Sequence, residues 1–272
     1  MRVLVLFILL LLPAAMSAQT YEELIDKSYE YLDKEDLPAA EESLRQAMRL
    51  EPGNPHNYAL LSNLGTIQRR QGKVEDALFS YTTALARHPM DIMVLSNRAS
   101  LYAEIGEKDK AIADYTSLLF ADNNNQDALY YRGLLHLQNK NFIEAESDFD
   151  KLLLINDKTL NGRIGFAVLE KLRGNYDESE RIYNYLIDEM PRHWPLYESR
   201  ADLYFMMERN ARAMADINRV FASSTQSAST YVLRAKIKIA QYERESARND
   251  LLTATEMGYD AEVIEELMKM CR

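Results

Sequence analysis

The chain has a single cysteine, Cys271, among its 272 residues. One cysteine excludes an internal disulfide framework and any zinc site built from several thiolates. The four histidines are scattered, and no two of them have the spacing of metal ligands on one helix face. We therefore expect no metal site. We expect Cys271 to be a buried thiol, although its place next to the chain end would also permit a bond to another chain.

Glycine is also scarce, with nine residues, and none of them forms a phosphate-binding loop. Gly162 and Gly165 lie in a segment of helical pattern with no strand before it, which is the wrong context for such a loop. Carboxylates are plentiful, but they alternate with basic residues as they do on solvated helix faces. We find no converging polar constellation, so we expect no catalytic residues and no cofactor. A hydrolase on a helical scaffold remains a minor alternative.

Basic residues are outnumbered, with 32 Lys and Arg against 42 Asp and Glu and a net charge of −10. This balance argues against nucleic acid as a partner. Residues 22–51 alone hold ten carboxylates. This acidic end either steers a basic partner or is simply a solvated face.

The chain has one long apolar run, at residues 3–12. The run follows Arg2 and precedes a stretch of small residues at 14–18. This pattern predicts a signal peptide over residues 1–18, cleaved after Ala18, with retention as an anchor as the alternative. The run is short for a bilayer, and no second run follows it. We expect an exported protein, periplasmic or secreted from a bacterial cell envelope, with no membrane span after cleavage.

What the chain does contain is a repeat. Small residues recur along the chain, with 37 residues between the first two and 34 between all later neighbours. They are Ala40, Ala77, Ala111, Ala145, Ser179, Ala213 and Ala247. A fixed period of this length predicts a stacked array of supersecondary units. We number the places of each unit so that this small residue stands at place 20. The numbering predicts a weak first repeat and an insertion over 19–57. Six repeats follow, at 58–91, 92–125, 126–159, 160–193, 194–227 and 228–261. A capping helix is expected over 262–272, after a helix stop at Gly258 and a start at Asp260.

Other places of the unit repeat with the same period. The residue at place 8 is small in every unit, and the residue at place 24 is large and apolar. Proline stands near the end of three units, as Pro52, Pro89 and Pro191. Small residues let two helices approach closely, the large residue fills the adjacent groove, and proline ends the second helix. Each unit is therefore predicted to be a pair of helices.

The pattern resembles the tetratricopeptide repeat, and the second unit matches best, through Leu64, Gly65, Gly72, Ala77, Tyr81, Ala84 and Pro89. The resemblance implies an all-α fold, a right-handed α-α superhelix (solenoid) of helical hairpins. It also implies a non-catalytic scaffold that binds a protein or peptide. The chain departs from the family at Gln68, Glu170 and Lys238, where tyrosine is common.

An arginine at the seventh place occurs together with an aspartate at the twenty-third, in four units: Arg98 with Asp114, Arg132 with Asp148, Arg200 with Asp216 and Arg234 with Asp250. Where one is missing, so is the other, as in Leu64 with Ser80 and Phe166 with Ile182. We interpret this as a repeated ionic bridge between helices, because a partly buried charge needs its partner. An arginine ladder that binds an anion is the less favoured alternative.

In the family the first helices line a concave groove, and the resemblance places apolar residues of this chain there: Tyr130, Leu134, Leu137, Ile164, Val168, Leu172, Phe205 and Met206. A cluster of this kind suits an extended peptide or an amphipathic helix. The alternative is that some of these residues pack between helices. The fifth unit is irregular, since its two glycines indicate a bend, a close ligand approach or ordinary drift.

We therefore expect an exported, non-catalytic protein–protein interaction scaffold that holds a polypeptide segment in its groove. The alternative is a module that binds a cell-envelope polymer or assists outer-membrane or secretion assembly.

Overall fold

The computed structural model describes residues 19–223 and 226–272. The predicted signal peptide, residues 1–18, lies outside them. The described residues form helices joined by short turns and contain no strand, so the expected all-α class is confirmed. The chain divides into two compact units, residues 1–110 and 111–272. The first contains α1 (Tyr21–Asp33), α2 (Leu37–Leu50), α3 (Asn57–Arg70), α4 (Val74–Arg87) and α5 (Ile92–Glu104).

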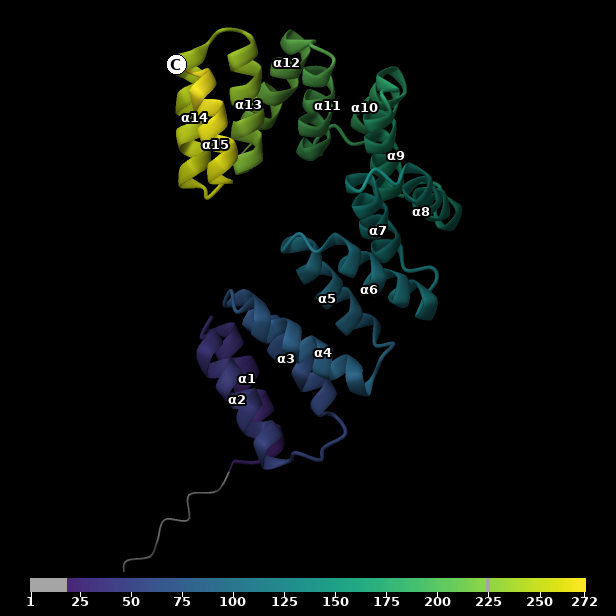
Figure 1. Ribbon diagram of the computed structural model, residues 1–272, viewed down its shortest axis with the longest axis vertical. Coiled ribbons are helices and arrows are strands. Elements are labelled where there is room, and N and C mark those ends of the chain that lie inside the picture. The colour runs from purple at the N-terminus through teal and green to yellow at the C-terminus, as the bar shows by residue number, and fades with distance from the viewer. Residues whose placement is uncertain (1–18, 224–225) are drawn as a thin grey trace, which may run out of the picture. The chain divides into compact units, whose positions relative to one another are not determined.

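The second unit contains most of α6 (Lys108–Ala121), followed by nine further helices. These are α7 (Gln126–Gln138), α8 (Phe142–Ile155), α9 (Leu160–Arg173), α10 (Tyr176–Glu189), α11 (Trp194–Met206), α12 (Asn210–Phe221), α13 (Ala228–Ala240), α14 (Arg244–Glu256) and α15 (Ala261–Met270). Odd-numbered helices from α1 to α13 are the first helices of hairpins and even-numbered ones the second helices. Within each unit the two helices of a hairpin pack side by side, as α3 with α4 and α7 with α8 (Figure 1).

The column of small residues lies where the two helices of a hairpin meet. All seven are fully buried, at 0% exposure: Ala40, Ala77, Ala111, Ala145, Ser179, Ala213 and Ala247. The large residues four places later are buried beside them, and Tyr81, Phe149 and Tyr183 are also at 0%. The close approach of helices that the periodicity predicts is therefore confirmed.

The two glycines of α9 have a packing role. A Cβ on Gly165 would lie 2.5 Å from the Phe149 ring, and one on Gly133 would lie equally close to the same ring. A Cβ on Gly162 would lie 2.7 Å from the Thr159 methyl. The space next to these glycines is therefore filled by the chain itself, which leaves no room there for a ligand.

Three of the predicted arginine–aspartate bridges are present, in the second unit. Arg132 and Arg200 each make two hydrogen bonds to their aspartate, at 2.6–2.9 Å, and Arg234 pairs with Asp250 in the same way. The three aspartates are buried, at 3–4% exposure. The fourth pair, Arg98 with Asp114, remains a prediction, because its residues fall in different units.

The second hairpin has no arginine–aspartate pair and uses another polar network. Gln68, at 1% exposure, accepts from the Ser80 hydroxyl at 2.7 Å and donates to Glu41 on α2 at 3.2 Å. Lys73 and Arg45 also donate to Glu41. Burial alone would raise the pKa of Glu41, but these hydrogen bonds lower it to about 2. A buried carboxylate thus ties the first two hairpins together.

The turn inside each hairpin contains one residue with positive φ, and these residues follow the repeat, with a spacing of 37 between the first two and of 34 between the others. They are Glu35, Gly72, Gly106, Lys140, Gly174, Glu208 and Tyr242. Only glycine adopts this conformation without steric cost, so the four other residues are held there by the packing of the two helices.

The last hairpin is covered by α15. Gly258 has positive φ just after α14, and the Asp260 carboxylate caps α15 by accepting from Glu262 N and Val263 N. Ile264 and Cys271 are buried against α13 and α14, so the expected buried thiol is confirmed. Met268 packs inward against the same cluster, whereas Met270 is 56% exposed.

Candidate binding groove on the first helices

Some first helices of successive hairpins contact one another. In the second unit α7 contacts α9 and α11 contacts α13, as α3 contacts α5 in the first unit. The resemblance assigns places 2, 5, 9, 12 and 13 of each unit to the concave side, and residues at these places line common hollows, from α7 with α9 and from α9 with α11 and α13. Two hollows lie on this surface, and together we call them the first-helix groove.

The first hollow, of about 420 Å³, lies between α7 and α9. Four predicted groove residues line it together: Leu134, Leu137, Val168 and Leu172. Leu137 is buried at 3% and forms the floor, whereas Leu172 is 44% exposed at the edge. This end of the groove is apolar.

The second hollow, of about 370 Å³, is lined mainly by α9, α11 and α13. Val168 lines both hollows, so the two adjoin along α9. The second hollow is more polar, and its walls carry Lys171, Glu198, Asp202 and Lys236. The groove thus changes from apolar to charged along its length.

Most of the charges in the second hollow are paired. Lys171 Nζ lies 2.6 Å from Asp202 Oδ2, and Glu198 accepts from the hydroxyls of Ser229 and Thr230, each at 2.9 Å. Lys236 is half-buried, and no ion pair among the described residues involves it. An unpaired ammonium group in a hollow is suited to bind a carboxylate.

A buried hydroxyl at the same hollow makes no hydrogen bond of normal geometry. Tyr183 has 0% exposure, and no residue among those described bonds to its Oη with normal geometry, although the Ser199 side chain lies close enough to lower the pKa of the phenol. Burial raises the pKa of the Tyr183 phenol above its usual value, so it stays protonated. A buried hydroxyl without a full hydrogen bond lowers the stability of the fold.

The other predicted groove residues line neither hollow. Tyr130 is half-buried with its ring against Tyr131, and Ile164 packs onto the cluster that contains Ala167 and Tyr183. Phe205 packs onto the neighbouring cluster around Ile217, and Met206 is 43% exposed. For Ile164 and Phe205 the structure therefore favours the alternative of packing between helices.

Sequence reasoning missed the polar half of the groove. Lys171, Glu198, Asp202 and Lys236 stand at places 12, 5, 9 and 9 of their units, which are places that the resemblance assigns to the groove. Charged residues at these places also fit a solvated helix face, so residue type alone does not assign them to a groove. Tyr183 has no such signal, since its place on a second helix is a core position in every repeat.

The comparisons with known proteins agree with this architecture. The tetratricopeptide repeat pattern matches residues 25–92, 63–126 and 96–159. A tetratricopeptide repeat protein from Parabacteroides merdae, whose crystal structure is known, is 62% identical in sequence to this chain. The match covers 93% of this chain and 99% of that protein's chain, and the two structures superimpose with a TM-score of 0.90. The chain belongs to the tetratricopeptide repeat family. Members of this family are scaffolds that bind protein partners.

More distant structures share the fold. The type IV pilus biogenesis factor PilW is 16% identical, with a TM-score of 0.61, over 79% of this chain and 100% of its own. The human tetratricopeptide repeat protein 6 is 33% identical over 82 residues, which is 30% of this chain and only 16% of that protein. Within residues 19–223 and 226–272, no helix of this tetratricopeptide repeat protein has the length and apolarity needed to cross a membrane.

Proposed function

We propose that this tetratricopeptide repeat protein is exported and holds a polypeptide segment of a partner in the first-helix groove. The observation that carries the proposal is the Tyr183 hydroxyl, which is buried at the groove and makes no hydrogen bond of normal geometry among the described residues. A peptide backbone supplies both carbonyl acceptors and N–H donors at regular intervals, so a bound segment can satisfy this hydroxyl.

The two ends of the groove indicate the chemistry of the segment. Leu134, Val168 and Leu172 offer an apolar surface for aliphatic or aromatic side chains. Lys236, in the adjoining hollow, offers an ammonium group to a carboxylate. The proposed ligand is therefore a segment that carries apolar residues next to an acidic one.

Export is supported by the pattern of residues 1–18, with Arg2, an apolar run and small residues in order. One structural neighbour, PilW, is a type IV pilus biogenesis factor, which agrees with a place in the cell envelope. The proposed location is the periplasm or the cell surface of a bacterium.

Tyr183→Phe tests the groove with two readouts of opposite sign. Removing a buried hydroxyl that makes no hydrogen bond of normal geometry is expected to raise the free energy of unfolding of the free protein by about 1 kcal/mol. The same change is expected to weaken partner binding by roughly tenfold, because the partner's polar group then has no hydrogen bond. Urea unfolding measures the first effect and titration with the captured partner the second.

Tyr81→Phe is the matched control, because Tyr81 occupies the same place of the second hairpin and its hydroxyl already bonds to Thr66 at 3.1 Å. That variant should lose stability. Loss of stability in Tyr183→Phe as well would show that its hydroxyl is already satisfied within the fold, and unchanged partner affinity would also contradict the proposal.

A further inference from the structure

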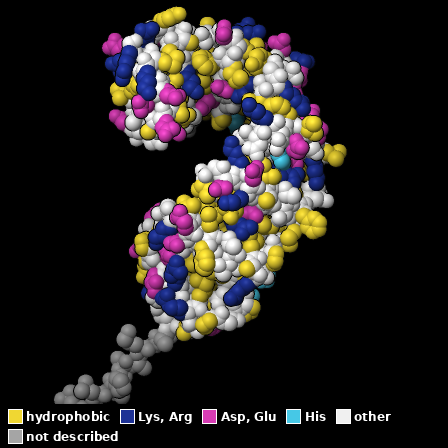
Figure 2. All heavy atoms as spheres, viewed as in Figure 1, with side chains coloured by type: hydrophobic (Ala, Val, Ile, Leu, Met, Phe, Trp, Pro, Cys, Tyr) yellow, Lys and Arg dark blue, Asp and Glu magenta, His cyan; other side chains and the backbone are white. Residues whose placement is uncertain are grey.

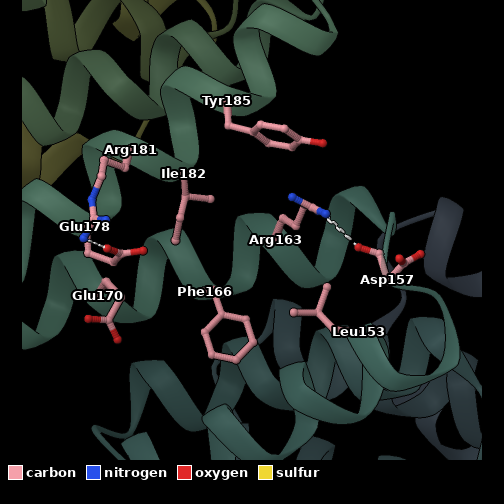
Figure 3. Close-up of a pocket in the computed structure, with 9 residues that line it drawn as sticks. All are labelled: Leu153, Asp157, Arg163, Phe166, Glu170, Glu178, Arg181, Ile182 and Tyr185. Carbon is pink, nitrogen blue, oxygen red and sulfur yellow. Dashed lines mark hydrogen bonds and ion pairs between the residues drawn. The ribbon is translucent and has the colours of Figure 1, made fainter.

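A larger cavity, of about 580 Å³, opens between α8, α9 and α10. It lies on the side of α9 away from the first-helix groove, because Phe166 lines the cavity and Val168 the groove, and residues two apart face nearly opposite directions on a helix. The cavity walls are apolar, with Leu153 from α8, Phe166 from α9, and Ile182 and Tyr185 from α10 (Figure 3).

The cavity exists because this hairpin lacks the arginine–aspartate bridge. In the hairpins on either side, the arginine spans the space between two second helices. Arg132 bonds to Thr116 on α6 and to Asp148 on α8, which lie 16 residues before and after it. Arg200 does the same with Asn184 and Asp216.

The equivalent residues here are Phe166 and Ile182, which are half-buried and bond to nothing. Neither side chain reaches across from α8 to α10 as an arginine does. The space between these two second helices therefore stays open, with a hydrophobic lining that water covers in the isolated chain.

The rim carries one unpaired charge of each sign. Arg163 donates through Nε and Nη2 to the backbone carbonyl of Asp157, at 3.2 and 2.9 Å, and lies over the Tyr185 ring (Figure 3). No ion pair among the described residues involves the Arg163 guanidinium or the Asp157 carboxylate. The other rim charges are neutralised, as Glu178 pairs with Arg181 and Glu170 with Arg173.

A large apolar side chain protrudes beside the cavity. Leu154, the neighbour of the lining residue Leu153, is 86% exposed on α8. The same small surface thus holds an apolar cavity, an apolar side chain that could fill one, a free cation and a free anion. A surface that carries both halves of each contact is complementary to itself, as a twofold interface requires.

We propose that this surface pairs two copies of the chain about a twofold axis. Leu154 of each copy enters the cavity of the other, and Arg163 of each copy pairs with Asp157 of the other. The pairing leaves the first-helix groove of both copies open, since the two surfaces lie on opposite sides of α9. It is therefore independent of the proposed peptide binding, and either proposal can fail alone.

Sedimentation velocity of the purified protein over micromolar concentrations tests the pairing. The expected result is a reversible dimer of twice the chain's mass.

Phe166→Arg combined with Ile182→Asp recreates the bridge of the neighbouring hairpins, fills the cavity and keeps the repeat pattern. This double variant is expected to raise the dimer dissociation constant at least tenfold with unchanged circular dichroism. Phe79→Ser, which removes a 73% exposed aromatic residue on α4, should leave it unchanged.

A charge exchange tests the geometry without touching the cavity. Arg163→Asp and Asp157→Arg should each weaken the dimer about tenfold, because like charges then face each other across the axis. The two changes together should restore it. A protein that is monomeric at every concentration would overturn the proposal, as would dimerisation that neither the cavity variant nor the single charge variants affect. Failure of the combined exchange to restore pairing would overturn it too.

Discussion

Replacing Asp148 with alanine is expected to lower the free energy of unfolding by about 3 kcal/mol. Asp148 is 3% exposed and holds Arg132 through two hydrogen bonds, at 2.6 and 2.9 Å. Without it, the guanidinium is left between α6 and α8 with only the Thr116 hydroxyl as a partner. The loss is at the lower end for buried pairs, because the Arg132 side chain remains 20% exposed.

Asp150→Ala on the same helix is the matched control. Asp150 is exposed and makes no bond among the described residues, so its removal should change stability by no more than about 0.5 kcal/mol. Both variants lose one negative charge, and urea unfolding compares them directly. Equal losses would mean that the bridge does not stabilise the hairpin.

Phe149→Ala is expected to lower the free energy of unfolding by about 4 kcal/mol, the largest effect that we predict. The ring is fully buried, at 0% exposure, and its edges lie against Gly133 and Gly165. Truncation therefore opens a cavity that two adjacent first helices share. Ile143→Ala, on the same helix but 78% exposed, should have little effect on thermal or urea unfolding.

A double-mutant cycle with Gly165→Ala tests the reason for the glycine. Alanine in a helix normally stabilises by about 1 kcal/mol relative to glycine. Here the new Cβ would lie 2.5 Å from the Phe149 ring, so Gly165→Ala should destabilise the wild-type chain by about 1–3 kcal/mol. In the Phe149→Ala background the ring is gone and the same change should stabilise. Additive effects would contradict this account of the packing.

The repeat made much of the fold predictable from the sequence. The small residue at place 20 and the large one at place 24 are buried because every hairpin packs in the same way. One place of the unit therefore predicts a buried residue in each of the seven hairpins. The bridges of Arg132, Arg200 and Arg234 were predictable for the same reason, since residues that are present or absent together report a shared contact.

Features that occur only once were not predictable in this way. Gln68 departs from the family pattern, and only the structure shows that it connects Ser80 with Glu41. In the proposed groove, apolarity predicts Leu134 and Val168 but not Lys236, because a binding surface also needs polar groups.

Site-specific photocrosslinking tests the central claim, that the first-helix groove binds a polypeptide. A photoreactive residue at Val168, where the two hollows adjoin, would be compared in native extract with one at Leu252, which is 50% exposed on the second helix α14. We predict a discrete protein adduct from position 168 that position 252 does not give and that Lys236→Glu reduces. Capture of glycan alone from position 168, or the same adducts from both positions, would contradict the account.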